Sequence, residues 1–297
     1  YITIDGHTAP GDGVCIAGYS TLVDTHDVVI RYLRFRRGAT NLFDRDDCLG
    51  GQPIGNIVVD HCSCSWGLDE NLSMYRHVYY PKGSTQFLKY PTLNITIQYC
   101  ISSEALNTYD HAFGGTWGGC NTSFHHNLFA CNTGRNPSIG MSYDFNFVNN
   151  VLFNWHHRTL DGGDQGSRVN CINNYYKPGP DTLPSVSHRI GKPQSSTFKP
   201  DPTRRYGKWY VAGNIVAGDP AVTEDNWNGG VEFDVQGARS ESPAVVAGRV
   251  QQLIAEVRAN KPFYMAPLKV ESAAAAYQDV LAHAGAILPD RDSVDQR

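Results

Sequence analysis

One short pattern of polar and apolar positions recurs along the chain. A polar residue is followed by alternating apolar residues and, at the seventh place, by a small or amide residue. The pattern starts at residues 27, 56, 94, 121, 144, 168 and 208. These starts lie about 23 to 40 residues apart with no helical period between them, which favours a solenoid of stacked parallel strands. A sandwich or barrel would instead show hairpin turns about every 8 to 12 residues.

The seventh place of the repeat changes from apolar residues to asparagine. Equal positions lie above one another in a stack of coils, so we expect the asparagines to form an amide ladder. Each side chain would bond its neighbour and the turn backbone, which is a structural role. The residues in this column are Leu33, Cys62, Cys100, Asn127, Asn150, Asn174 and Asn214.

The final part of the chain follows a helical pattern. Residues 243–258 place apolar side chains at helical spacing, and residues 271–283 read as a second helix that Ser272 caps. The sequence therefore predicts a solenoid over residues 1–242, with a long excursion at about 178–208. A C-terminal helical extension over residues 243–297 is expected to cover the side or the open end of the solenoid.

Composition and charge narrow the classes of partner. The chain has 297 residues, of which 41% are apolar, enough for a large buried core. Its 29 acidic and 25 basic residues give a formal charge of −4, so we expect no nucleic-acid partner and no anionic membrane surface. No apolar run is long enough to cross a bilayer. The solenoid pattern is already under way near Tyr1, and an uncapped first coil would favour self-association.

The eight cysteines include no CxxC pair, so a zinc ribbon and a thioredoxin motif are excluded. Cys62 and Cys64 point to the same face of a strand and cannot easily bridge each other. Buried free thiols and one or two disulfides both remain open.

Columns of the repeat bring together residues that carry charge. Fourteen places after successive starts come Glu70, Thr108, Arg135 and Arg158. Asp69 stands thirteen places after its own start. One side of the solenoid therefore changes from acidic to basic over about three coils, an arrangement that suits an anionic substrate.

Asp60, Asp69 and Glu70 are candidate metal ligands. They lie close together in the sequence, and oxygen donors of this kind favour a hard cation, above all calcium. The alternative is that Asp69 and Glu70 sit in a solvated turn. Arg135 lies in a turn sequence in which packing does not require an arginine, and it is either a site residue or a surface residue.

Histidines and aromatic residues near the turns have two interpretations each. His125 and His126 are adjacent on a strand and face opposite ways, so they do not chelate one ion together, and a buried or ladder role is favoured. The rings of Trp117 and Phe113 either stack on sugars or fill the core. Trp66, Trp155 and Tyr109 belong to the same group.

An ordered set of segments resembles the pectate lyase family of polysaccharide lyases. These segments are residues 56–63 (Asn-Ile-Val-Val-Asp-His-Cys-Ser), 69–73 (Asp-Glu-Asn-Leu-Ser), 123–129 (Ser-Phe-His-His-Asn-Leu-Phe) and 134–137 (Gly-Arg-Asn-Pro). The resemblance covers most of the chain, and it implies a right-handed parallel β-helix, which agrees with the repeat. It also implies a secreted enzyme that cleaves a polyuronate such as pectate by calcium-assisted β-elimination.

The resemblance also implies roles for individual residues. Asp60 and Asp69 would be calcium ligands, and Arg135 would be the base that removes the C5 proton of a galacturonate. That proton is α to a carboxylate, so a cation that neutralises the carboxylate lowers the barrier to its removal. Free guanidinium holds its proton strongly, so stabilisation of the charged intermediate is the simpler role for Arg135.

The chain departs from the family pattern at three places. Ser73 stands where a further aspartate is usual, so Glu70 or water would complete the calcium shell. His111 is the nearest candidate for the role of a substrate-binding lysine. Gly140 stands where a second arginine is usual, and Arg158 from the next coil would substitute for it. With Trp117, these residues form the candidate substrate-binding set.

Two other functions remain open on the same scaffold. An inverting glycoside hydrolase needs two carboxylates that flank the bond, and Asp44, Asp46 and Asp47 form the only local cluster. A non-catalytic β-helix that binds acidic glycans is the other alternative, because fold does not fix function.

Overall fold

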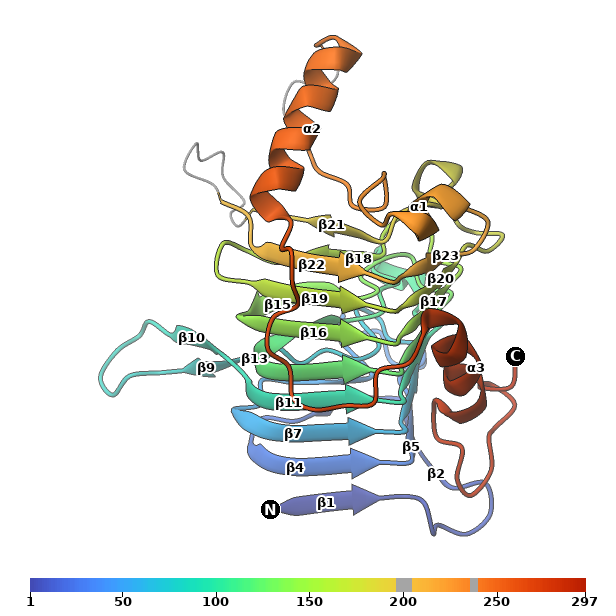
Figure 1. The fold of residues 1–297 in the computed structure, drawn as a ribbon. Helices are drawn as coiled ribbons and strands as arrows, with labels where there is room; N and C mark the ends of the chain where they lie inside the picture. The colour runs from blue at the N-terminus through green and yellow to red at the C-terminus, as the bar shows by residue number, and fades with distance from the viewer. Residues whose placement is uncertain (196–204, 236–239) are drawn as a thin grey trace.

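The computed structural model is a parallel β-helix with helices at its C-terminal end (Figure 1). It describes residues 1–195, 205–235 and 240–297. The expected solenoid of parallel strands is confirmed, since the ladders between successive coils are parallel. Part of the expected excursion at 178–208, residues 196–204, lies outside the described residues.

The strands form three ladders along the solenoid. The first joins β1 (Ile2–Asp5), β4 (His26–Arg31), β7 (Gly55–Asp60), β11 (Leu93–Gln98), β13 (Thr116–His125), β16 (Asp144–Val148), β19 (Arg168–Ile172) and β22 (Lys208–Ala212). The second joins β2 (Val14–Ala17), β5 (Leu33–Arg36), β8 (Ser63–Ser65), β12 (Ile101–Ser103), β14 (Leu128–Ala130), β17 (Val151–Phe153), β20 (Tyr175–Lys177) and β23 (Ile215–Val216).

The third ladder positions the candidate site. It contains β3 (Thr21–Leu22), β6 (Leu49–Gly50), the first half of β13, β15 (Ser138–Ser142), β18 (Leu160–Gly162) and β21 (Gly191–Pro193). Single bridges link its coils where strands are short. An antiparallel hairpin, β9 (Arg76–Tyr79) with β10 (Leu88–Pro91), projects from this region, and 3₁₀ turns occupy Asn107–Tyr109 and Pro184–Val186.

Alternating apolar residues of the first ladder fill the core. The strand register stacks Ile30, Val59, Ile97, Phe124, Phe147, Cys171 and Val211 in one inward column. All seven are buried. Period-two alternation therefore places one face of every coil in a continuous apolar core.

The amide ladder that the repeat predicted is present. Asn150 Nδ2 donates to Asn174 Oδ1 (3.1 Å), and its Oδ1 accepts from the backbone N–H of Asn127 (3.0 Å). The same pattern continues through Asn214 to Asn226. The preceding turn position has a positive φ in Tyr32, His61, Tyr99, His126, Asn149, Asn173 and Gly213.

The C-terminal segment runs back along the solenoid (Figure 1). Helix α1 (Pro220–Glu224) follows the last coil, and α2 (Pro243–Val257) projects beyond it with only Val257 buried. The chain then crosses the first ladder and enters α3 (Ala273–His283), which packs beside β17 and β20. Ser272 caps α3 as predicted, because its Oγ accepts from Ala275 N. Thus α3 covers a side of the solenoid, and α2 does not cover its end.

All eight cysteines are free in this structure, and the expectation of buried thiols holds for Cys48, Cys62, Cys64, Cys100 and Cys171, whereas Cys15 and Cys131 are exposed. Among the described helices, none combines the length and apolar character needed to cross a membrane.

Candidate active site

The third ladder brings residues from consecutive coils into one column. Parallel bridges join Glu70 to Phe113 and Phe113 to Gly134. Arg135 follows Gly134, and its φ of 51° turns the chain at this point. The predicted change from acidic to basic residues along this column is therefore present. In the coil between Glu70 and Arg135, however, Phe113 occupies the column position that was assigned to Thr108.

Arg135 lies between carboxylates and an aromatic ring. Its Nη1 forms an ion pair with Glu70 Oε1 and lies 3.7 Å from Asp69 Oδ1. Its guanidinium carbon lies 4.4 Å from the centre of the Phe113 ring. Burial opposes the charge of Arg135, but Glu70 and Asp69 more than offset this effect and raise its pKa above the usual value. The side chain is 27% exposed, so a ligand can reach it.

A third carboxylate, Asp47, lies beside the two that face Arg135. Asp47 Oδ1 accepts from Glu70 N at 3.0 Å. Burial, followed by the charges of Glu70 and Asp69, raises the pKa of Asp47 well above its usual value. Burial and Glu70 also raise the pKa of Asp69, against the effect of Arg135. The buried Asp69 Oδ1 has no hydrogen-bond partner among the described residues. Carboxylate oxygens are the donors that a hard cation such as calcium prefers, but in the described part of the chain these three side chains do not offer ligand atoms that all lie within 4.8 Å of one another, so they would have to move closer together to share one ion.

Ser73, the first departure from the family pattern, supports Glu70. Its Oγ donates to Glu70 Oε2, and Thr116 Oγ1 donates to Glu70 Oε1 at 2.6 Å. These two bonds fix both carboxylate oxygens of Glu70. Ser73 therefore does not supply the further carboxylate of the family pattern, but orients the carboxylate of Glu70.

His111 lies at the edge of the same group. Its Nε2 is 3.9 Å from Asp69 Oδ1 and 3.3 Å from Arg45 Nη1. Arg45 Nε is 3.4 Å from Asp69 Oδ2. The imidazole meets the Phe113 ring edge-on, with ring centres 4.8 Å apart. The structure therefore brings His111, Asp69, Glu70 and Arg135 together.

Arg158 joins this group from the next coil. Its guanidinium carbon lies 5.1 Å from the centre of the Phe113 ring, so one ring carries both Arg135 and Arg158. Arg158 Nε lies 3.1 Å from Asp161 Oδ2, which keeps the side chain in place. A Cβ at Gly134 would lie 2.9 Å from Arg158 Nε, so glycine permits this approach. At Gly140, a Cβ would collide with Tyr75, which leaves no room for an arginine there.

The structure does not bring Asp60 to this site. Asp60 ends β7 in the first ladder, where its carboxylate binds Arg31 (3.1 Å), His61 (2.7 Å) and Gln98 (2.9 Å). Two corners of the coil, around β8, separate it from Asp69. Although Asp60 is close to Asp69 and Glu70 in the sequence, it does not lie beside them in the structure. Asp47 is the third carboxylate beside Asp69 and Glu70.

Trp117 is also placed elsewhere. It is 1% exposed, packs against Phe124 and Phe129, and donates from Nε1 to Leu72 O (2.8 Å). The assignment of Trp117 to the substrate is therefore wrong, and the core-filling interpretation is correct. Sequence reasoning missed Arg45 as a site residue, named Asp47 only among the carboxylates of the hydrolase alternative, and left Phe113 between sugar stacking and core filling. The run of charges at residues 44–47 was the available signal for Arg45 and Asp47.

Comparison with known proteins gives relatives of one kind, although no protein-family model matches the chain. A "Probable pectate lyase C" of Aspergillus flavus is 36% identical over 189 residues, which cover 61% of this chain and 40% of the relative. A protein of the same name from Aspergillus fumigatus is 33% identical over 219 residues, covering 67% of this chain and 46% of the relative. The chain thus spans less than half the length of these relatives.

A solved structure shows the same fold. The pectate lyase of Bacillus sp. N165, determined in complex with trigalacturonate, superposes with a TM-score of 0.55 and 15% identity. The match covers 91% of this chain and 71% of that one. This likeness shows the fold, and the sequence relatives show that the chain is a divergent member of the pectate lyase family.

Proposed function

We propose that the protein cleaves a polyuronate such as polygalacturonate by calcium-assisted β-elimination. The observation that carries this proposal is the position of Arg135. Its guanidinium is accessible, faces the carboxylates of Glu70 and Asp69, and has Arg158 one coil away. An acidic sugar chain that lies along this column would meet both arginines.

Different residues of the site would bind the substrate, hold calcium and remove the proton. Arg158 and His111 would bind substrate carboxylate or hydroxyl groups on either side of Arg135. Asp69 and Glu70, with Asp47, would hold calcium, which neutralises a uronate carboxylate and so acidifies the C5 proton. Arg135 in its deprotonated form would take that proton. The C5–H electrons form the C4=C5 double bond, the C4–O bond breaks, and the leaving oxygen takes a proton from solvent.

The raised pKa of Arg135 has a consequence for the reaction. Glu70 and Asp69 hold the guanidinium in its charged form, so a deprotonated Arg135 is scarce at neutral pH. Turnover is therefore expected to increase with pH, by up to about tenfold per pH unit while deprotonation limits the rate. The charged form would still stabilise negative charge that develops at the uronate carboxylate.

An acidic polymer of this kind lies outside the cell, so we propose that the protein is secreted. The membership of the pectate lyase family supports this proposal. The acidic and basic groups that line one column support the same proposal, because they suit an acidic polysaccharide as the substrate.

The direct test is to mix the protein with polygalacturonate and calcium and to follow the ultraviolet absorbance of the unsaturated product. Arg135→Ala is expected to lower the rate at least about 100-fold, because the group that acts on the C5 proton is lost. Arg168→Ala is the matched control, since Arg168 is exposed at the start of β19 in another ladder. A chelator should abolish the signal and added calcium should restore it.

Other outcomes would contradict the proposal. Full activity of Arg135→Ala would remove Arg135 from the mechanism. New reducing ends without ultraviolet absorbance would show hydrolysis. Binding of uronides without turnover at neutral and alkaline pH would show a glycan-binding β-helix.

A further inference from the structure

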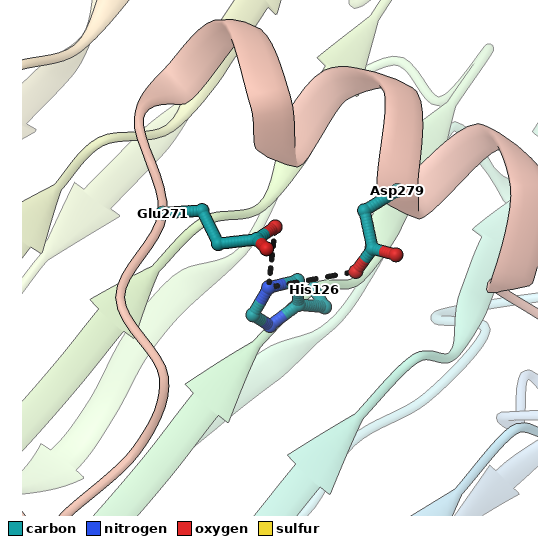
Figure 2. A group of neighbouring side chains, drawn as sticks. All are labelled: His126, Glu271 and Asp279. Carbon is teal, nitrogen blue, oxygen red and sulfur yellow. Dashed lines mark ion pairs between the residues drawn. The ribbon is translucent and has the colours of Figure 1, made fainter.

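His126, Glu271 and Asp279 meet where the C-terminal segment crosses the turn after β13 (Figure 2). His126 Nε2 lies 3.7 Å from Glu271 Oε2 and 3.8 Å from Asp279 Oδ2. One ligand atom of each residue lies within 4.8 Å of the other two. The fold thus brings together an imidazole and two carboxylates that are far apart in the sequence.

Two polar atoms at the centre of this group lack hydrogen bonds. His126 is 3% exposed, and its Nε2 has no hydrogen-bond partner among the described residues. The same holds for the buried Glu271 Oε2. The separations of 3.7 and 3.8 Å are too long for hydrogen bonds. A buried ring nitrogen without a partner is costly, so this arrangement needs an explanation.

The other nitrogen of His126 favours a ligand role. Its Nδ1 lies 2.9 Å from Nδ1 of His125. When His126 Nδ1 donates to His125, His126 Nε2 presents its lone pair to the two carboxylates, which is the form that binds a metal.

The surroundings hold the three side chains in place. Tyr99 stacks on His126 with ring centres 4.8 Å apart, and its hydroxyl donates to Asp279 Oδ2 at 2.8 Å. Asn149 Oδ1 accepts from Glu271 N (2.9 Å), and its Nδ2 donates to Glu271 O (2.8 Å). The bond from Tyr99 to the Asp279 carboxylate is of the kind that orients ligands in metal sites, and the two bonds of Asn149 fix the backbone of Glu271.

Charge and spacing define the kind of ion. Two carboxylates face one imidazole, and the nearby cation, Lys269, pairs with the outer oxygen of Glu271. One nitrogen and two oxygen donors suit a borderline divalent ion such as Zn²⁺. Ligand atoms in a tetrahedral zinc site lie about 3.3 Å apart, so the two separations from His126 Nε2, 3.7 and 3.8 Å, need to shorten by only about 0.4 to 0.5 Å, while the two carboxylates already lie within 4.8 Å of each other.

We propose that His126, Glu271 and Asp279 bind one zinc-class divalent cation, with water in the remaining position. The ion would link α3, through Asp279, and the segment before it, through Glu271, to His126 in the turn after β13. This site uses none of the residues of the candidate active site, so the proposal does not depend on the lyase activity.

The test is to titrate the chelator-treated full chain with Zn²⁺ by calorimetry, with thermal unfolding in parallel. We expect one Zn²⁺ per chain, a rise in Tm, and visible absorption from Co²⁺ in the same site. Glu271→Gln and Asp279→Asn keep the size of each side chain and should weaken affinity at least about tenfold. Tyr99→Phe should weaken it by about tenfold or more, because only the hydrogen bond to Asp279 is lost.

Tyr32→Phe is the matched control. Tyr32 stacks on His61 in the same row of rings but does not touch Asp279, so zinc affinity should be unchanged. The proposal is overturned if no stoichiometric binding occurs, or if Glu271→Gln and Tyr99→Phe both bind Zn²⁺ as the wild type does. It is also overturned if acidification alone stabilises this junction and zinc adds nothing, because His126 would then pair with the carboxylates as an imidazolium.

Discussion

Asp47 is the carboxylate with the least favourable surroundings in the candidate active site. It lies against Glu70 and Asp69, and burial and these two charges raise its pKa. Arg135 pairs with Glu70 and lies near Asp69, and Arg45 also faces Asp69. A cation among the three carboxylates would relieve this repulsion, so the same residue that destabilises the ion-free protein is expected to favour calcium binding.

Asp47→Asn should therefore have opposite effects with and without calcium. The amide oxygen can still accept from Glu70 N, but the buried charge is gone, so Tm in a chelator should rise. Affinity for calcium should fall at least about tenfold, or about 1.4 kcal/mol. Thermal unfolding with and without calcium measures both effects.

Asp44→Asn is the matched control, since Asp44 is an exposed neighbour on the same loop. It should change neither Tm nor the calcium response. A lower Tm of Asp47→Asn together with an unchanged calcium response would exclude Asp47 from the cation site.

At the scale of the element, the turns between the first and second ladders hold the coils in register. Asn150 of the amide ladder accepts from the backbone N–H of Asn127 and donates to the carbonyl of Phe124, both in the preceding coil, and it also donates to the side chain of Asn174 in the next coil. Asn150 is fully buried. Loss of one amide therefore leaves buried backbone groups in two coils without partners.

Asn150→Ala is expected to destabilise the protein by about 2–4 kcal/mol, because the N–H of Asn127 and the carbonyl of Phe124 lose their partner. Urea unfolding measures this change. Asn260→Ala is the control at an exposed position and should cost less than about 0.5 kcal/mol. Equal small effects of both substitutions would show that the ladder contributes little.

Local patterns account for what the sequence predicted at this scale. Strand alternation, the asparagine column and the Ser272 cap each depend on residues near one another in the chain. Thr108 was placed in the site column wrongly because a 3₁₀ turn at Asn107–Tyr109 lengthens that coil and moves Phe113 into register. Asp60 was expected beside Asp69 and Glu70, and Asp47 was not, because the corners of a coil decide which ladder each residue joins, and the repeat does not encode these corners.

At the scale of the whole molecule, the end of the described chain contacts the early coils. Arg36 Nη2 on β5 lies 2.8 Å from Asp295 Oδ1, and Arg34 Nη2 donates to Ala286 O at 2.7 Å. Ser63 on β8 also donates to Asp295. Both arginines are buried, so these contacts satisfy charges that would otherwise be costly in the core.

Asp295→Asn should loosen the early coils selectively. It removes one charge that faces Arg36, while Asp292 remains 3.2 Å away, so the cost is expected to be about 2 kcal/mol, below that of a fully unpaired buried charge. Hydrogen exchange should become faster in β2 and β5 and stay unchanged in β19 and β22. Asp290→Asn, at an exposed position in the same segment, is the control. Uniform acceleration along the solenoid would contradict a local role.

The return of the C-terminal segment also changes how the chain can be divided. In a simple solenoid each coil contacts only its neighbours, so a cut in the middle separates two independent stacks. Here residues 285–297 hold the early coils from outside the stack. A break in the exposed tip between β9 and β10 would leave two fragments. They would be joined by the strand pairing between consecutive coils and also by the contacts of residues 285–297 with the early coils. We therefore expect two fragments that are made separately to reassemble into one folded protein.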